Sequence, residues 1–175
     1  MNWLELDDPA TLPGSGQGAG WCAPLERPTI RVSRRFMASP QRVFDAWLDP
    51  DVAGTWLFAT ASRPIAKVEI DGRVEGSFCF VERHGGAIIE HTGEYLEITP
   101  PRRLVFSLAM GRHPHALTRV GVGITPLQKG CELILTHDNV PAACAEDTAL
   151  RWTGILYGLG VTLDPDAIEF HNHQE

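Results

Sequence analysis

The sequence predicts an α+β fold, in which an antiparallel sheet of seven strands has its helices gathered on one side. Two observations carry this prediction. Seven segments between residues 29 and 139 alternate apolar and polar residues with the period of two that is typical of strands, and short links join the last six. A long pattern with the period of a helix follows them, and its apolar face needs a sheet to lie on.

The first strand is expected at residues 29–37, where Ile30, Val32 and Phe36 alternate with polar residues. Arg34 falls on the same side of this strand, because side chains two positions apart share a face. The sequence therefore places an arginine on the apolar side of the first strand.

Two short helices are expected next. Ser39 offers a hydroxyl as the N-cap of the first helix, and Pro40 takes its first position, where the missing N–H of proline costs nothing. One apolar edge of this helix is formed by Val43, Phe44, Trp47 and Leu48. The helix ends at Asp49-Pro50, and residues 51–58 are expected to form a second short helix or a turn.

The six remaining strands should form an antiparallel meander, because the links between them are short. They are expected at residues 65–70, 74–82, 87–98, 103–110, 118–126 and 131–139. The clearest corner is Pro100-Pro101. Consecutive prolines remove two backbone donors and hold φ near about −65°, so one strand must end at Ile98 and the next begin near Arg103.

A long C-terminal helix is expected from Pro141 to Asp164-Pro165. Its apolar face follows spacings of three and four, at Ala149, Trp152, Leu156, Leu159 and Leu163. These spacings indicate a helix with one buried side.

Three glycines, Gly154, Gly158 and Gly160, lie inside this helix, where each costs about 1 kcal/mol relative to alanine. One interpretation is a helix that moves to admit a ligand. The other is close packing of the helix on Gly121 and Gly123, and this is the simpler of the two.

Domain boundaries follow from composition. Residues 1–28 have a glycine-rich middle with too little apolar content to repay the entropy of ordering, and they read as a leader. Trp3 and Trp21 are large enough to pin this leader onto the body or onto a second subunit. Residues 29–164 are expected to form one domain, and residues 165–175 a C-terminal tail.

Composition argues against several classes of protein. No apolar run in the 175 residues approaches the ~18 that a membrane span needs. A net charge of −7 argues against a nucleic-acid partner, whose phosphates require a basic surface. The N-terminus lacks the basic start and apolar stretch of a secretory signal. We therefore expect a cytoplasmic protein without a membrane or nucleic-acid partner.

The four cysteines, Cys22, Cys79, Cys131 and Cys144, are widely spaced and form no Cys-x-x-Cys pair. Isolated cysteines in a reducing compartment are usually small buried apolar residues. Cys144, near the predicted start of the long helix, is the candidate for a reactive thiol.

Three segments are specific enough to suggest a family. They are Ser39-Pro40-x-x-Val43-Phe44-x-Ala46-Trp47, the proline corner within residues 93–106, and Thr136-His137 leading into the helix with Trp152. With them, residues 28–164 resemble the START-like superfamily (SRPBCC, birch-pollen-allergen-like), and within it the family related to the C-terminal domain of the heat-shock-90 ATPase activator. The resemblance implies a helix-grip fold, whose seven-stranded sheet wraps around the long C-terminal helix with a cavity between them.

Strand alternation and the helix pattern nominate the residues that would line this cavity. The candidates are Trp56, Phe78, Phe80, His91, Tyr95, Phe106, Leu108, Val120, Val122, Leu135, His137, Trp152, Ile155, Leu156 and Leu159. The resemblance implies space for a small apolar molecule among them. The same residues would equally make a filled core.

Candidates for chemistry are few. His91, Glu94 and His137 are the polar strand residues that could orient a ligand or exchange protons, although a histidine on a strand is more often structural. Donors at the cavity rim could come from Arg34, Arg119 and Tyr157, although surface ion pairing explains the arginines as well. The sequence contains no nucleophile elbow, P-loop or dinucleotide-binding motif, so we predict no catalytic residue.

Two histidine pairs, His113-Pro114-His115 and His171-Asn172-His173, each resemble half of a metal site. Their close spacing and exposed settings favour adventitious binding. We expect neither a metal nor an organic cofactor.

The first functional hypothesis is binding of a small apolar molecule, lipid-like or aromatic, between the sheet and the long helix. The resemblance implies two alternatives, a cyclase or aromatase-type enzyme and a chaperone-binding module. Residues 1–28 are too short to form the large N-terminal domain that precedes this domain in the activator, which argues against the chaperone partner. A homodimer, through an edge strand or through the leader, is a further expectation.

Overall fold

The computed structural model describes residues 27–59, 64–84, 86–110 and 113–164. Seven strands within these residues form one antiparallel sheet in the order β1-β7-β6-β5-β4-β3-β2. The strands are β1 (Ile30–Phe36), β2 (Ile65–Ile70), β3 (Ser77–His84), β4 (Ala87–Thr99), β5 (Arg103–Met110), β6 (His113–Pro126) and β7 (Cys131–Asp138). Most of the predicted leader and all of the predicted tail lie outside the described residues.

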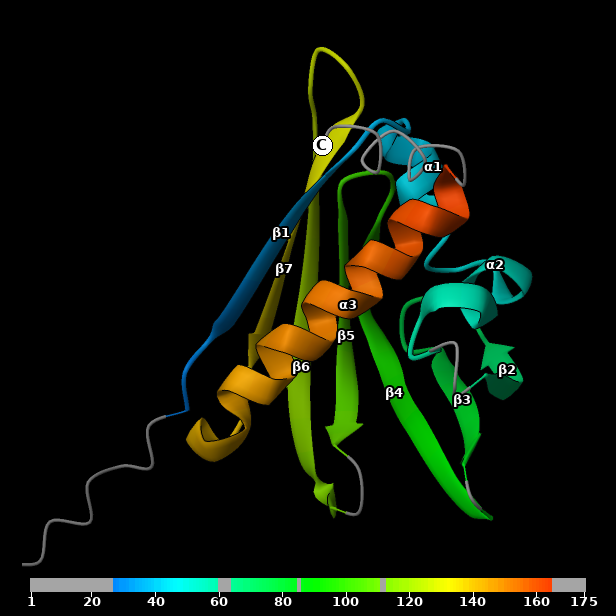
Figure 1. Cartoon of the computed structure of the whole chain (residues 1–175), viewed down its shortest axis with the longest axis vertical. Coiled ribbons are helices and arrows are strands. Elements are labelled where there is room, and N and C mark those ends of the chain that lie inside the picture. The colour runs from blue at the N-terminus through cyan, green and yellow to red at the C-terminus, as the bar shows by residue number, and fades with distance from the viewer. Residues whose placement is uncertain (1–26, 60–63, 85, 111–112, 165–175) are drawn as a thin grey trace, which may run out of the picture.

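The helices lie on one side of the sheet (Figure 1). The long helix α3 (Ala145–Leu163) follows a short 3-10 turn and crosses the face of the sheet from β1 toward the two short helices. These are α1 (Pro40–Asp45) and α2 (Pro50–Trp56), and α2 contacts both β2 and α3. The predicted α+β class, the seven antiparallel strands and the helix-grip arrangement are confirmed.

The caps and corners form as the sequence predicts. The Ser39 side chain accepts a hydrogen bond from the Arg42 backbone N–H at 3.3 Å, which starts α1. At the proline corner, Ile98 pairs with Leu104 and Thr99 with Arg103, so β4 ends and β5 begins where the prolines require. This corner fixes the register of the two strands that carry Tyr95 and Phe106.

Three element boundaries differ from the sequence-based expectation. β3 begins at Ser77 rather than at residue 74, because the chain turns at Glu75, whose φ is 66°, and at Gly76, which packs against the Asp71 carbonyl. β6 begins at His113 rather than at residue 118, because Met110 and His113 still pair across the hairpin. The α-helical hydrogen bonding of α3 begins at Ala145, after a 3-10 turn.

The expectation that the helix glycines pack on Gly121 and Gly123 is wrong. A Cβ atom on Gly158 would lie 3.7 Å from Trp56, and one on Gly160 would lie 3.2 Å from the Arg34 guanidinium. The glycines of α3 therefore meet α2 and β1 instead of β6. At Gly154 a Cβ atom would meet nothing within 4 Å, so this glycine faces open space.

The core lies between the sheet and α3 and is rich in aromatic rings. Trp47 and Trp56 make an edge-to-face contact with ring centroids 4.8 Å apart, and Trp47 also contacts Phe106 and Trp152. The Trp56 indole N–H donates to the Ala46 carbonyl at 3.2 Å, so its polar atom is satisfied. These contacts join α1 and α2 to the sheet and to α3.

Candidate functional site

A chain of buried hydrogen bonds links α3 to three strands through His137. The Trp152 indole N–H donates to Nδ1 of His137 at 2.9 Å, so Nδ1 carries no proton. Nε2 of His137 therefore carries the proton and donates to Oγ1 of Thr118 at 2.7 Å, and the Thr118 hydroxyl donates to the Leu108 carbonyl at 2.8 Å. Each donor in this series of three hydrogen bonds has an acceptor. The series therefore holds α3 on the sheet through His137.

Burial opposes protonation of His137, which is 1% exposed. Loss of hydration lowers the pKa of the His137 imidazole to about 4, although the nearby Asp138 carboxylate acts in the opposite direction. The imidazole is neutral at physiological pH. A histidine whose two nitrogens are both engaged has no free atom for a ligand, so the structure gives His137 a structural role.

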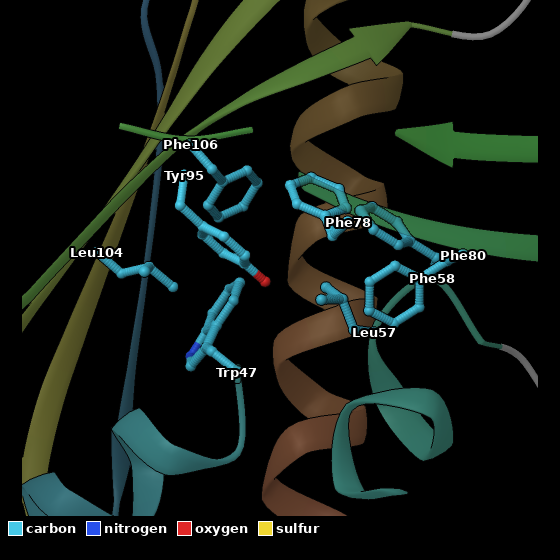
Figure 2. A pocket seen from close by; sticks show the side chains of 8 residues that line it. All are labelled: Trp47, Leu57, Phe58, Phe78, Phe80, Tyr95, Leu104 and Phe106. Carbon is cyan, nitrogen blue, oxygen red and sulfur yellow. The ribbon is translucent and has the colours of Figure 1, made fainter. Parts of the chain in front are cut away.

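The space between the sheet and α3 is filled. Figure 2 shows the remaining enclosed cavity, which has a volume of about 10 Å³. It is lined by Trp47, Leu57, Phe58, Phe78, Phe80, Tyr95, Leu104 and Phe106. A single water needs roughly 10–15 Å³, so the expected open cavity is not found among the described residues.

Two polar groups belong to side chains that line this cavity: the indole N–H of Trp47, which is buried without a hydrogen-bond partner among the described residues, and the hydroxyl of Tyr95. Tyr95 is 3% exposed, and its hydroxyl points into the space between Trp47 and Leu57 (Figure 2). Burial raises the pKa of the Tyr95 hydroxyl. A buried hydroxyl that points into this cavity supplies a hydrogen-bonding group there.

Open space lies beside the core instead. A groove of about 860 Å³ runs between α2, α3 and the ends of β3 and β4. We call it the α2–α3 groove, and it is lined by Thr55, Trp56, Phe58, Ala59, Glu82, His91, Leu150, Arg151, Gly154, Ile155, Tyr157, Gly158, Val161 and Thr162. Phe58 lines both the groove and the enclosed cavity, so its ring separates the two.

Three side chains form a polar and aromatic wall of the groove. His91 stacks on Phe58 with ring centroids 4.3 Å apart and an interplanar angle of 6°. Nε2 of His91 lies 3.4 Å from a carboxylate oxygen of Glu82, and the side chains of His91 and Glu82 are 13% and 6% exposed. Phe58 holds a φ of 63°, in the left-handed region that bulky residues rarely adopt. Such strain is found at functional sites more often than elsewhere.

Two opposing effects act on the pKa of His91. Burial lowers the pKa of the His91 imidazole, and the hydrogen bond to Glu82 raises it by less. The imidazole is therefore neutral at physiological pH. A neutral imidazole beside a carboxylate can accept a proton or orient a hydrogen-bonding ligand.

The predicted cavity residues divide into three groups. Four of them, Phe78, Phe80, Tyr95 and Phe106, line the small enclosed cavity. Three of them, Trp56, His91 and Ile155, line the α2–α3 groove. The others are buried in the core: Leu108, Val120, Val122, Leu135, His137, Trp152, Leu156 and Leu159.

Sequence reasoning did not nominate Glu82 or Phe58, and it singled out Glu94, which does not line the groove. Glu82 was missed, although it continues the inward alternation of Phe78 and Phe80 on β3, and a carboxylate at an inward position is a signal that could have found it. Phe58 was missed because a positive φ leaves no mark in a sequence. Glu94 is exposed on the opposite face of β4 from His91, so Glu82 is the acidic neighbour of His91.

The remaining candidates are the predicted rim donors and the cysteines. Arg119 is exposed on β6, away from the groove, whereas Tyr157 lines its rim. Cys131 is buried, Cys79 is half-buried and Cys144 is exposed, with Cys22 outside the described residues. Burial raises the pKa values of the Cys79 and Cys131 thiols.

Within the described ranges, no three side chains of His, Cys, Asp or Glu come close enough to share a metal ion. The second predicted histidine pair, at residues 171 and 173, lies outside those ranges. None of the helices in the described part of the chain combines the length and the hydropathy of a membrane span.

Known structures with this fold include bacterial proteins. A protein from Chromobacterium violaceum is 28% identical, with a TM-score of 0.70, and the similarity covers 79% of this chain and 98% of that one. An AHSA1-like protein from Aeromonas hydrophila is 22% identical, with a TM-score of 0.70 over 85% of this chain and 100% of that one. The Aha1 dimer from Colwellia psychrerythraea is 17% identical, with a TM-score of 0.63 over 78% of this chain and 96% of that one.

No curated protein sequence matches the chain. A family model does match it over residues 37–164, and the family is described as activator of Hsp90 ATPase homolog 1-like protein. The match begins just after β1 and ends just after α3, so it covers most of the fold described above. The chain therefore belongs to the activator of Hsp90 ATPase homolog 1-like family, within the START-like (SRPBCC) helix-grip superfamily.

Proposed function

We propose that this protein binds a small, mainly apolar molecule, lipid-like or aromatic, in the α2–α3 groove. The single observation that carries the proposal is the groove itself. Its volume of about 860 Å³ lies in the range of small-molecule sites, which is roughly 300–1,000 Å³, whereas the enclosed cavity of about 10 Å³ holds no such molecule.

The lining of the groove suits a mainly apolar ligand with one polar end. Leu150 and Tyr157, which are 66% and 49% exposed, supply apolar surface in the groove, and burying a ligand against them provides the affinity. Glu82 and His91 lie together at one wall, where they can orient a hydroxyl or carbonyl group of the ligand. The apolar lining of the groove would thus supply the affinity, and the Glu82–His91 pair would orient the ligand.

Phe58 links the groove to the interior. Because its ring lines both spaces, a rotation of that ring would connect the groove with the cavity beneath Tyr95. The left-handed backbone of Phe58 provides a strained position from which such a change can start.

Gly154 provides a direct test of the groove. A leucine there projects into open space, because a Cβ atom on Gly154 meets nothing within 4 Å, and Gly154 lines the groove. The probe is N-phenyl-1-naphthylamine, an uncharged dye whose fluorescence rises in apolar surroundings. We expect Gly154→Leu to weaken dye binding at least about tenfold, while Gly154→Ala, which adds only a methyl group, retains it. Equal binding by both variants would show that the dye site is not this groove.

A ring-closing enzyme of the cyclase or aromatase type is the second candidate function, and the Glu82–His91 pair favours it. A neutral imidazole can take a proton from an activated C–H group, and the neighbouring carboxylate would stabilise the imidazolium that forms. With a linear poly-β-ketone as substrate, His91→Gln should abolish turnover. Glu94→Gln, on the outer face of the same strand, is the matched control. Turnover retained by His91→Gln would exclude this function.

A further inference from the structure

A second pocket lies on the other side of α3, between β1 and the C-terminal half of the helix. Its volume is about 390 Å³. We call it the β1–α3 pocket, and it is lined by Arg34, Arg35, Phe36, Met37, Ala38, Tyr157, Gly160, Val161, Leu163 and Asp164. Apart from Tyr157 and Val161, its lining is distinct from that of the α2–α3 groove.

Arg34 is the central residue of this pocket. It lies on the inward face of β1 with the buried residues Ile30 and Phe36. Its guanidinium carbon is 5.1 Å from the centroid of the Tyr157 ring, and the absence of a side chain at Gly160 leaves room for Nε and Nη2. The aromatic ring and the helix therefore hold the guanidinium group in one place, which prepares it for a ligand of fixed geometry.

One donor of Arg34, Nε, has no acceptor among the described residues. This atom is buried, and Arg34 forms no ion pair with any residue in the described part of the chain. Other arginines differ: Arg35 pairs with Glu132, and Arg42 donates to the Leu163 carbonyl. A buried guanidinium donor without an acceptor is unfavourable, because it has lost its water and gained no partner.

Stacking on aromatic rings and the negative end of α3 both stabilise the charge of Arg34. Neither uses the N–H groups in the plane of the guanidinium. Those groups match the two oxygens of a carboxylate, with which arginine forms paired, charge-assisted hydrogen bonds. The Nε donor of Arg34 thus has no acceptor among the described residues, and an anionic ligand would supply one.

We propose that the β1–α3 pocket binds a monocarboxylate that carries an apolar chain. The carboxylate pairs with Arg34, and Phe36, Val161 and Leu163 contact the chain. Asp164 lines the same pocket, and its negative charge disfavours a dianion such as phosphate. This inference does not depend on the proposed function of the α2–α3 groove.

Calorimetry with octanoate tests the proposal on the full chain. Octanoate should bind at least about tenfold more tightly than octanol, which has the same chain without the charge, and more tightly than inorganic phosphate. Binding should also shift the NMR signals of the Arg34 Nε–H and the Gly160 amide. Equal binding of octanoate and octanol, tighter binding of phosphate, or shifts confined to His91 and Ile155 of the groove would each overturn it.

Charge-matched variants sharpen the test. Arg34→Gln should weaken octanoate binding about tenfold or more, whereas Arg31→Gln, an exposed position on the same strand, should leave it unchanged. Equal weakening by both variants would mean that only net charge matters. Gly154→Leu blocks the groove and should not affect octanoate, and Arg34→Gln should not affect the uncharged dye. The two proposals therefore fail independently.

Discussion

At the scale of single residues, the buried histidine shows how hydrogen bonding assigns a role. His137 accepts from Trp152 and donates to Thr118, so one tautomer is fixed and both nitrogens are engaged. His91, by contrast, stacks on Phe58 at the wall of an open groove. Two histidines that look alike in the sequence therefore differ in function: one joins a helix to the sheet, and the other faces a candidate ligand site.

His137 should make stability depend on pH. Its pKa is about 4 in the folded chain, against 6.5 as the ordinary value, so between these two pH values the unfolded chain binds a proton that the folded chain does not. Stability is then fully present above about pH 6.5 and falls as pH decreases toward 4, by roughly 3 kcal/mol in total.

Urea denaturation at several pH values measures this dependence. The variant His137→Gln cannot titrate and should lose most of the slope between pH 6.5 and 4. The lowered pKa of His91 acts in the same direction and remains in both proteins, so the difference between the two slopes isolates His137. Identical slopes would contradict the assignment.

Thr118→Val should be destabilising because it removes the acceptor of the His137 N–H and the donor to the Leu108 carbonyl, both buried. We expect a loss of about 1–3 kcal/mol in the free energy of unfolding. Thr125→Val, at an exposed position on the same strand, is the control and should change stability by less than about 0.5 kcal/mol. A harmless Thr118→Val would mean that the buried network contributes nothing.

Residue types and alternation predicted the inward faces of the strands but not what each polar group contacts. His137 was predicted to face inward, and it does, yet its pairing with Trp152 depends on how α3 lies across β7. Glu94 lies three residues after His91, so strand alternation places it on the opposite face. The proximity of Glu82 to His91, however, requires the register of β3 on β4. Register is a property of paired strands, and a single sequence does not contain it.

At the scale of elements, the glycines of α3 determine how closely its neighbours approach the helix. Gly158 and Gly160 allow Trp56 and Arg34 to approach the helix, whereas Gly154 faces open space. Helix propensity explains the cost of each glycine but not its position. The sequence shows three glycines at unfavourable positions inside a helix. Only the structure shows that two of them pack against α2 and β1.

Alanine substitutions separate the three positions. Gly154→Ala should stabilise the protein by about 0.5–1 kcal/mol, because alanine favours the helix and its methyl group meets nothing. Gly160→Ala should gain less or lose stability, because its Cβ atom would lie 3.2 Å from the Arg34 guanidinium. Urea denaturation measures both, and a larger gain at Gly160 than at Gly154 would contradict the packing described here.

At the scale of the whole molecule, the sequence predicted the order and direction of the elements, but not where the open space lies. Strand period, the proline corner and the long helix determine the order and direction of the elements, and these are confirmed. Whether aromatic side chains fill the interior depends on rotamers and on differences of a few ångströms between layers. The cavity left in the interior is about 10 Å³, and the larger spaces lie on the two sides of α3, in the α2–α3 groove and the β1–α3 pocket.

Dimerisation through a sheet edge stays a prediction. β1 and β2 are the two edge strands of the sheet. Both edges carry exposed charges, Lys67 and Glu69 on β2 and Arg31 and Arg35 on β1, and charged edges discourage pairing with a second sheet. Light scattering of the intact chain and of a chain without residues 1–28 distinguishes an edge-strand dimer from one that needs the leader.

Native mass spectrometry of the purified protein tests the central claim most directly. The claim is that the α2–α3 groove binds a small apolar molecule, and the measurement compares the unaltered chain with Gly154→Leu after incubation with N-phenyl-1-naphthylamine. We predict a one-to-one complex for the unaltered chain and its loss in Gly154→Leu. A chain that binds no dye, or a Gly154→Leu variant that binds it equally well, would contradict the claim.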